Sequence, residues 1–350
     1  MRQGARRQLG TTVATIGLLA GALLWNGTTA LATVLVLGAL EITLSFDNAV
    51  LNAAVLSRMS ARWQQVFLTV GILVAVVGVR LVLPLLMIAV TAGITPAQAW
   101  DLALHHPLDY QTAVAVARPG FGSFGAAFLL VASIEFFAAT HHETWLRGER
   151  WLAHLGSQTR VRRGVGTALV TSLLTLFLTG EPAAALGAAT GILSALVLAR
   201  VAGRMGTGLD TAVVGAGLGS FLYLEVLDAS VSVDGVMGAF AITTDVVVMA
   251  LGLGLGALYV RTLTVTFARS SRIRQLAYLE HGAYYAIGTL GLALAVSFAV
   301  ELPSLLIAAT ELLIIGGAVA ASVRVARRAS EPELLATAGT LTLHPQETRT

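Results

Sequence analysis

Two short segments of this chain combine carboxylate, hydroxyl and amide side chains in a similar order. Residues 41–48 read Glu-Ile-Thr-Leu-Ser-Phe-Asp-Asn (the first motif), and residues 228–235 read Asp-Ala-Ser-Val-Ser-Val-Asp-Gly (the second motif). Oxygen ligands of this kind suit hard divalent cations such as Mg²⁺, Ca²⁺ or Mn²⁺. The chain has no Cys, which removes thiolate metal sites and thiol catalysis. The candidate metal ligands are Glu41, Ser45, Asp47, Asn48, Glu225, Asp228, Ser232 and Asp234.

Spacing along a regular helix decides which of these side chains converge. Glu41, Ser45, Asn48 and Asn52 share one helix face, whereas Asp47 points about 120° away from it at 100° per residue. The second motif repeats this pattern, with its first acid and its second Ser on one face and its second acid displaced. Because clustered carboxylates repel one another, we expect a partly protonated site that exchanges protons for metal.

The composition indicates that lipid surrounds most of the chain. Hydrophobic residues make up 56% of the sequence, charged residues make up 12%, and the mean hydropathy is +0.80. A soluble domain of this length needs more charge to cover its surface. The net charge of +3 comes with 22 basic residues, all of them Arg. In a membrane protein such an excess is typical of cytoplasmic loops, so we expect no nucleic-acid binding.

Ten apolar segments are long enough to cross the hydrocarbon layer, which takes about 20 residues. With the N-terminus in the cytoplasm, Arg118 is the one Arg residue in an external loop, and Arg261 falls in a cytoplasmic loop with most others. This asymmetry predicts an all-α polytopic protein of the inner membrane with about 9–10 transmembrane helices and both termini cytoplasmic. The predicted spans are 8–25, 28–57, 63–93, 121–140, 164–180, 182–200, 211–241, 245–262, 280–299 and 302–323.

The two motifs lie in spans that cross the membrane in opposite directions. Each of these two spans is the second in a half of five spans. An inverted-topology repeat predicts this arrangement and places its ligand site near the membrane midplane between the halves. Both spans carry Asn or Gly at the motif, so we expect two long, broken helices whose free carbonyls line a cavity.

Arg80 lies at the centre of the third span and requires a carboxylate partner there. Asp47 or Asp234 is the partner we predict, with Arg80 acting as the internal cation when no metal is bound. An ion pair with a structural role away from the transport path is the alternative.

Four other titratable residues lie within or at the ends of spans and are assigned supporting roles. Glu135, Glu280 and His281, together with residues 141–143, form either a cytoplasmic vestibule for cations or an ordinary membrane interface. Glu311 lies in the middle of the tenth span, where its role is either to carry protons or to pack against a neighbouring helix.

The longest external loop, at about 94–120, contains two His residues flanked by acids. These residues could bind a metal at the surface, although a polar interfacial segment is the simpler interpretation. They are Asp101, His105, His106 and Asp109.

Four tracts together resemble the integral membrane TerC family, which is related to the LysE exporter superfamily. The likeness is strongest to a branch catalogued as an uncharacterised membrane domain, and it extends over about residues 28–320. The tracts are Leu44-Ser-Phe-Asp-Asn-Ala-Val, Asp234-Gly-Val followed by Gly-Ala-Phe-Ala-Ile-Thr, Arg80-Leu-Val-Leu-Pro, and Leu279-Glu-His-Gly.

The resemblance implies an exporter of Mn²⁺, sometimes of Ca²⁺, in a family named for tellurite resistance. It implies Asp47, Asn48 and Asp234 as core ligands, with Glu41 and Asp228 beside them. Gly235 takes the place that corresponds to Asn48, so the two halves of the site are not equivalent.

The domain organisation follows from the spans. The basic residues at positions 2, 6 and 7 precede an apolar run as in a signal peptide with cleavage near Ala30, but the downstream charge pattern favours a retained first helix. The expected parts are an N-terminal segment at 1–27, a transmembrane transport domain at 28–323 with halves at about 8–180 and 182–323, and a disordered cytoplasmic tail at 324–350.

We therefore expect a transporter that exports a hard divalent cation, with Mn²⁺ as the first choice and Ca²⁺ or Mg²⁺ as alternatives. We expect no enzymatic activity and no permanently bound cofactor, with the lipid bilayer as surroundings and a homo-oligomer left open. The alternatives are an exporter of amino acids or other small solutes, and an accessory protein for metalation or tellurite resistance. An intramembrane aspartyl protease is disfavoured because the extra acids would disturb a dyad that shares one proton.

Overall fold

The structure is a computed structural model that describes residues 2–57, 59–137, 145–146, 149, 180–204, 211–240, 242–270, 275–300 and 302–341. Every regular element within these residues is a helix, which confirms the all-α prediction. Five helical stretches in the described part are long and apolar enough to cross a membrane, so the chain is a multi-pass membrane protein. They are Gly10–Leu44, Ala61–Ala92, Pro107–Phe137, Val246–Arg269 and Leu306–Ala326.

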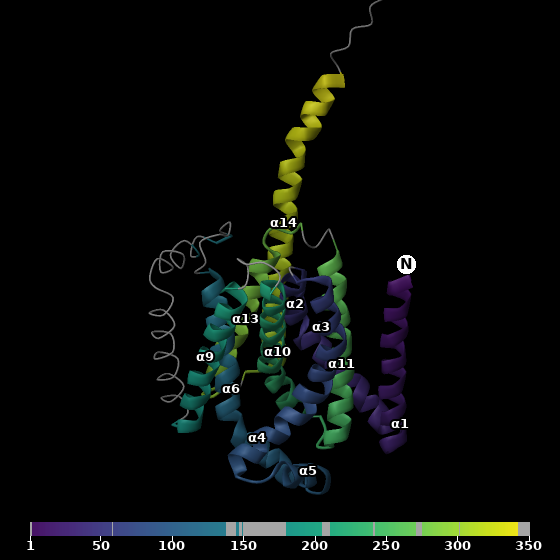
Figure 1. Cartoon of the computed structure of the whole chain (residues 1–350), viewed down its shortest axis with the longest axis vertical. Coiled ribbons are helices and arrows are strands. Elements are labelled where there is room, and N and C mark those ends of the chain that lie inside the picture. Colours follow the sequence, from purple (N-terminus) through teal and green to yellow (C-terminus); the bar gives the residue numbers. More distant parts are fainter. Residues whose placement is uncertain are drawn as a thin grey trace, which may run out of the picture.

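The N-terminal helix α1 (Arg2–Leu44) contains a sharp kink where we expected the turn between the first two spans. Asn26 and Gly27 leave the helical conformation, and Gly27 takes a positive φ of 66° that only Gly adopts without strain. After the kink the helix turns back along the bundle and, past a single turn residue, continues as α2 (Phe46–Ser57) (Figure 1).

The third span is continuous but changes its winding in the middle. It consists of α3 (Ala61–Leu73), the π-helix η1 (Val74–Val82) and α4 (Leu83–Ala92). Pro84 has no backbone N–H, and in an α-helix its ring would collide with the carbonyl of Arg80. The chain avoids this collision by widening the turns before Pro84, and Arg80 lies in the widened segment.

The segment at 94–120 is helical, so the prediction of a long external loop was wrong. Pro96 and Pro107 each take the first position of a helix, where a missing N–H costs nothing. These helices are α5 (Pro96–His105) and α6 (Pro107–Phe137). The turn between α4 and α5 lies at the end of the bundle opposite the start of α1 (Figure 1).

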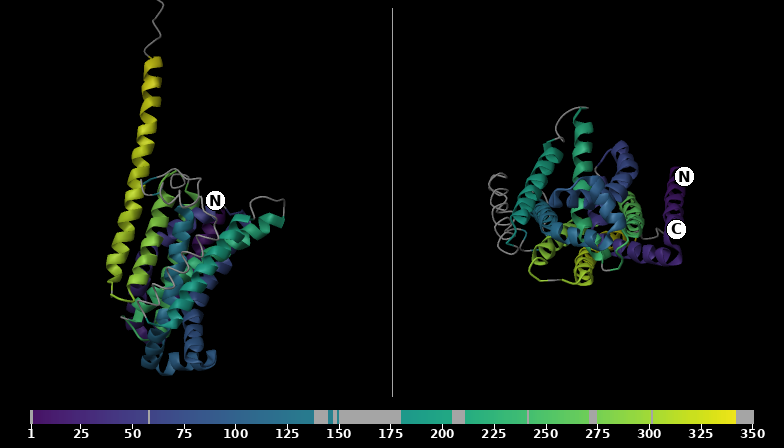
Figure 2. Two further views of the ribbon diagram at one scale, coloured as in Figure 1. Left: turned by 90° about the vertical axis from the view of Figure 1, so that its left-hand side faces the viewer. Right: turned by 90° about the horizontal axis from the view of Figure 1, so that it is seen from below.

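The described part of the second half of the chain adds five further helices to the bundle. The tail from 324, which we expected to be disordered, continues the last helix to Leu341, and Figure 2 shows this helix extending well beyond the others. Its Ala, Leu, Glu and Arg content favours a helix. Residues 164–179 of the predicted fifth span lie outside the described residues. The helices are α9 (Pro182–Arg204), α10 (Thr211–Phe240), α11 (Val246–Arg269), α13 (Leu279–Val296) and α14 (Ser304–Leu341).

Arginine is concentrated at one end of the bundle. Helix α3 begins, and α9 and α11 end, at the end where α1 starts and from which α14 extends (Figure 1). These three helix ends carry Arg62, Arg204 and Arg269. The segregation agrees with the charge asymmetry of the sequence.

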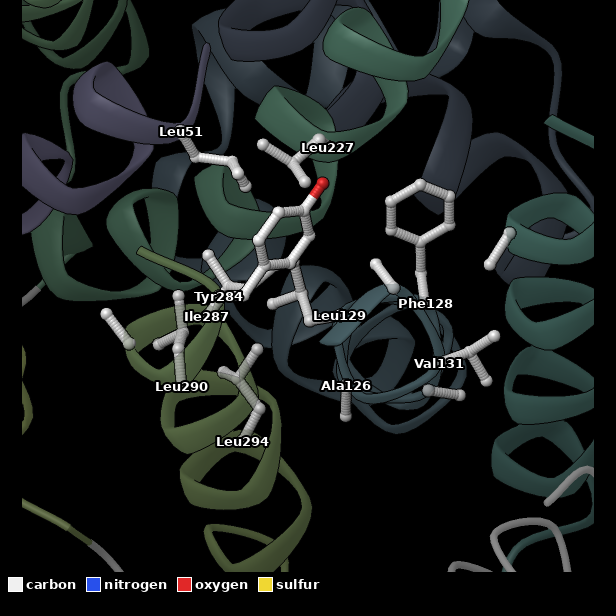
Figure 3. Close-up of a cluster of buried hydrophobic side chains, with 14 of the residues drawn as sticks. Leu51, Ala126, Phe128, Leu129, Val131, Leu227, Tyr284, Ile287, Leu290 and Leu294 are labelled. Carbon is white, nitrogen blue, oxygen red and sulfur yellow. The ribbon is translucent and has the colours of Figure 1, made fainter. Parts of the chain in front are cut away.

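The largest apolar core joins α2, α6, α10 and α13. Tyr284 lies at its centre among Leu51, Leu129 and Leu227, as Figure 3 shows. The ring of Phe136 stacks on that of Tyr284 with 3.9 Å between centroids. This core holds the two motif helices against each other.

Glycines let α9 approach α6 closely. A methyl group added at Gly191 would overlap the backbone carbonyl of Phe124, and one added at Gly187 would overlap that of Gly120. Small residues that allow such contact are typical of helix pairs in membranes, where apolar burial alone gives little drive for association.

Gly191→Val is therefore expected to destabilise the bundle. Overpacking of this kind costs about 1–3 kcal/mol, so the purified protein should unfold several degrees below the wild type in a detergent thermal-shift measurement. Gly316→Val is the matched control, because nothing lies within 4 Å of a methyl group added there. Equal unfolding temperatures for the two variants would contradict the proposed contact.

Candidate functional site

Arg80 bridges the two motifs inside the bundle. Its Nη2 lies 2.5 Å from Oε1 of Glu41, and its Nη1 lies 3.1 Å from Oδ2 of Asp228. Glu41, Arg80 and Asp228 are 1%, 4% and 5% exposed. Two buried carboxylates therefore share one guanidinium, which places both ion pairs in a region of low dielectric constant.

Neighbouring polar side chains fix the orientation of both carboxylates. Ser45 Oγ donates to Oε1 of Glu41 at 3.0 Å, and Asn48 Nδ2 donates to Oδ1 of Asp228 at 2.9 Å. Arg80 Nη1 also donates to the carbonyl of Ala75 on its own π-helix at 2.9 Å. Four of the eight predicted ligands thus meet around one arginine.

The contacts between the motif helices show that the two motifs run antiparallel. Asn48 touches Asp228, and a methyl group at Gly235 would lie 3.0 Å from Oε2 of Glu41. Moving forward from Glu41 to Asn48 therefore corresponds to moving back from Gly235 to Asp228. In the residue-by-residue alignment, Glu41 corresponds to Asp228 and Asn48 corresponds to Gly235. The two contacts are therefore equivalent, as an inverted repeat requires.

The prediction of two broken motif helices was wrong for the second motif and holds only weakly for the first. Helix α10 is continuous through residues 228–235. Between α1 and α2 the irregularity is limited to Ser45, and Ser45 N to Glu41 O and Ala49 N to Ser45 O remain bonded at 3.0 and 3.1 Å. Freed backbone carbonyls are not needed here, because side chains of Arg80, Ser45 and Asn48 supply the partners of the described motif acids.

Glu41 is further enclosed by α11. A methyl group at Gly256 would lie 2.6 Å from Cγ of Glu41 and 2.9 Å from the carbonyl of Gly38. Gly256 is therefore required for the carboxylate to reach Arg80.

A second buried ion pair lies on the other side of Asp228. Arg261 Nη2 is 2.9 Å from Oε1 of Glu225, and Arg261 Nη1 donates to the carbonyl of Phe67 at 2.8 Å. The guanidinium also lies 4.0 Å from the centroid of the Phe67 ring. The prediction that placed Arg261 in a cytoplasmic loop was wrong, because α11 continues to Arg269 and leaves this side chain 4% exposed.

The separate pairing of Glu225 removes it from the group around Arg80. The helical spacing puts residues 225 and 228 on neighbouring positions of one face of α10, so nothing in the sequence indicates that they have separate partners. Gly71 makes the second pair possible, because a methyl group there would overlap the guanidinium of Arg261 and lie 2.6 Å from Oε1 of Glu225.

Two other predicted residues line small pockets beside the Arg80 site. Glu311 of α14 lines one pocket together with Glu41, Ser45 and Gly235. Ser232 lines another, and its hydroxyl donates to the backbone carbonyl of Asp228 at 2.7 Å, so it supports the helix.

His281, one of the predicted vestibule residues, packs inside the bundle. His281 is 5% exposed, lies at right angles to Phe136 with 5.4 Å between centroids, and has Nε2 3.8 Å from Oε2 of Glu149. The sequence reasoning missed Glu149, which accepts from Tyr285 Oη at 3.0 Å. Glu135 and Glu280 are half-buried, and residues 141–143 lie outside the described residues.

The acids and histidines near residues 101–109 form two exposed pairs. His105 Nδ1 lies 2.8 Å from Oδ1 of Asp101, and His106 Nδ1 lies 3.9 Å from Oδ2 of Asp109. The first pair joins adjacent turns of α5, and the second joins the residue between α5 and α6 to the first turn of α6. They agree with the simpler interpretation of a polar interfacial segment.

The side chains of Asp47 and Asp234 lie outside the described part of the structure, although their backbones belong to α2 and α10. Among the described residues, no group of three or more acidic or histidine side chains is placed to hold a metal ion. Around Arg80, the described oxygen atoms that a cation could use are those of Glu41, Asp228, Asn48 and Ser45, with Arg80 between the carboxylates.

The fold and this site define a polytopic helical membrane protein with paired carboxylates where two antiparallel helices meet. Residues 46–329 match a family model described as a protein of unknown function (DUF475). The match covers most of the chain, so the protein belongs to that family. No curated protein and no solved structure matches it.

Replacing Arg80 tests whether its positive charge stabilises the two buried carboxylates. Arg80→Ala leaves Glu41 and Asp228 buried without a positive partner, and losing one member of a buried pair costs about 3–5 kcal/mol. We expect this variant to unfold at a much lower temperature or to accumulate poorly in the membrane.

Neutralising the whole group should restore much of this loss. The triple variant Arg80→Met, Glu41→Gln and Asp228→Asn carries no unpaired charge, so it should be more stable than Arg80→Ala alone. A triple variant that is less stable than the single one would contradict the charge-balance explanation.

Proposed function

We propose that this protein is an inner-membrane transporter that exports a hard divalent cation, with Mn²⁺ as its first substrate. The observation that carries the proposal is the sharing of one buried cation by Glu41 and Asp228, which come from the two halves of the chain. A substrate bound by both carboxylates would contact both halves at once, which is the arrangement that alternating access needs.

Arg80 and a metal ion would compete for the same carboxylates. Each charge pair at about 4 Å is worth about 4 kcal/mol at an effective dielectric constant near 20, so neither carboxylate can lose its partner without a replacement. A divalent cation can replace the guanidinium at both carboxylates. Because Arg80 stays in the bundle, the arrival of the metal adds two positive charges, which the release of protons from motif carboxylates would offset.

The local structure around Arg80 provides a way to release it. Arg80 lies in a π-helix, a widened and less regular winding that is frequent at functional sites. Its Nη1 already bonds to the carbonyl of Ala75, which belongs to the same helix. The guanidinium therefore has an acceptor that it can keep while the carboxylates turn to a substrate.

The ligand types favour Mn²⁺, Ca²⁺ or Mg²⁺ over softer metals. The described oxygens are carboxylate, hydroxyl and amide oxygens, and the motifs add Asp47 and Asp234 from the same two helices. The resemblance to the TerC family supports the same class of substrate. We infer that the arginine-rich end of the bundle faces the cytoplasm and that protons exchange for the metal.

A growth test decides between this proposal and its alternatives. Asp228→Asn and Asp47→Asn should each lose the protection that the wild type gives against toxic Mn²⁺ in cells lacking other manganese exporters, because each removes a carboxylate ligand. Asp101→Asn, at an exposed position on α5, is the matched control and should protect like the wild type. Expression of every variant is measured in the membrane fraction.

Equal protection by the wild type and the two motif variants would overturn the carboxylate-site proposal. Efflux of radioactive manganese and of amino acids from preloaded vesicles then separates the substrate classes. Export of amino acids without manganese would instead favour the small-solute exporter. Protection without efflux of either would favour an accessory protein.

A further inference from the structure

Three buried oxygen atoms beside the Arg80 site have no hydrogen-bond donor in the described part of the chain. They are Oδ1 of Asn48, Oδ1 of Asn52 and Oε2 of Glu225, on residues that are 0%, 3% and 6% exposed. A buried acceptor without a donor is costly, and native structures rarely leave several together. A cation bound here would supply the missing partner of these oxygens.

Asn48 and Glu225 each use one polar atom of the side chain in a hydrogen bond and leave the other without one. Asn48 directs its amide nitrogen to the carboxylate of Asp228, so its oxygen must point elsewhere. Glu225 gives one oxygen to Arg261 and keeps the other free of hydrogen bonds. Asn52 lies one turn beyond Asn48 on the same face of α2.

The antiparallel register brings the three residues to one interface. Because Asn48 lies opposite Asp228, a step of one turn forward on α2 corresponds to one turn back on α10. That step reaches Asn52 on one helix and Glu225 on the other. Asn52 and Glu225 therefore lie on facing turns of α2 and α10, one turn from the contact between Asn48 and Asp228.

The charge of the surroundings selects the kind of ligand. Within the two described groups of ion pairs, Glu41, Glu225 and Asp228 carry three negative charges, and Arg80 and Arg261 carry two positive ones. One negative charge remains. Two neutral amide oxygens and a carboxylate already shared with Arg261 suit a single positive charge, whereas a divalent ion is better matched by more carboxylates.

We propose that Asn48, Asn52 and Glu225 form a binding site for a monovalent hard cation, with Na⁺ as the species. The site is separate from the position that Arg80 now shares with Glu41 and Asp228. Asn48 connects the two, since its amide contacts Asp228 on one side and offers its oxygen on the other. A role for Na⁺ in driving export rests on the proposed function, but its binding does not.

Thermal unfolding of the purified full-length protein in detergent tests the site directly. NaCl should raise the unfolding temperature with a saturable dependence, compared with choline chloride at the same ionic strength and pH. Asn52→Ala removes one ligand without breaking an ion pair and should weaken the apparent Na⁺ affinity about tenfold or more. Asn26→Ala, at an exposed position, is the matched control and should keep the wild-type response.

Three results would overturn the proposal. They are a wild type that responds equally to NaCl and choline chloride, an Asn52→Ala variant with an unchanged Na⁺ response, and a stability that depends on pH but not on Na⁺. Asn52→Asp covers the case in which Asn52→Ala does not fold. The added carboxylate should shift the response from Na⁺ toward Ca²⁺, and an unchanged preference for Na⁺ would also overturn the site.

These measurements need no transport. A protein that binds Na⁺ but exports no Mn²⁺ would keep this site and refute the proposed function. A protein that exports Mn²⁺ without a specific response to Na⁺ would support the proposed function and refute the Na⁺ site.

Discussion

The burial of two carboxylates against one guanidinium determines much of what surrounds it. In hydrocarbon, Glu41 and Asp228 must each have a positive partner, and Arg80 provides it for both. The third span winds as a π-helix around Arg80, and Gly256 leaves room for the carboxylate of Glu41. The widened turns before Pro84 and the small residue on α11 thus both serve the approach of Arg80 to its carboxylates.

The same requirement is met a second time on α10. Glu225 pairs with Arg261 from α11, less than one turn from the Asp228 pair. Each half of the chain therefore supplies one arginine from its third predicted span to a carboxylate near the motif crossing. Because α10 contributes to both pairs, a movement of this helix would change both sets of partners together, which couples the two halves mechanically.

Much of the fold followed from the sequence because lipid imposes simple rules on length and polarity. The turn at Asn26 and Gly27 and the direction of the motif helices followed from those rules. Arg261 was missed because hydropathy assigns a charge at the end of an apolar run to a loop. Segment 94–120 was missed because short helices that begin at Pro lack a long apolar signal. The described partners of Arg80 are Glu41 and Asp228, which lie on the polar helix faces that the residue spacing predicted. Our prediction of Asp47 or Asp234 as its partner had ignored that spacing.

The formal charges of the motif helices link the two proposed cations. The motif helices contribute five acids to this region, and two arginines face them. The acids are Glu41, Asp47, Glu225, Asp228 and Asp234, and the arginines are Arg80 and Arg261. Three negative charges then remain, and one divalent and one monovalent cation together would neutralise them. Low dielectric makes any uncompensated charge expensive, so the departure of a divalent ion must be accompanied by movement of Arg80, by protons, or by both. Arg80 is already counted among the two arginines, so its movement only exchanges partners, and protons taken up by motif carboxylates replace the two positive charges of the departing metal.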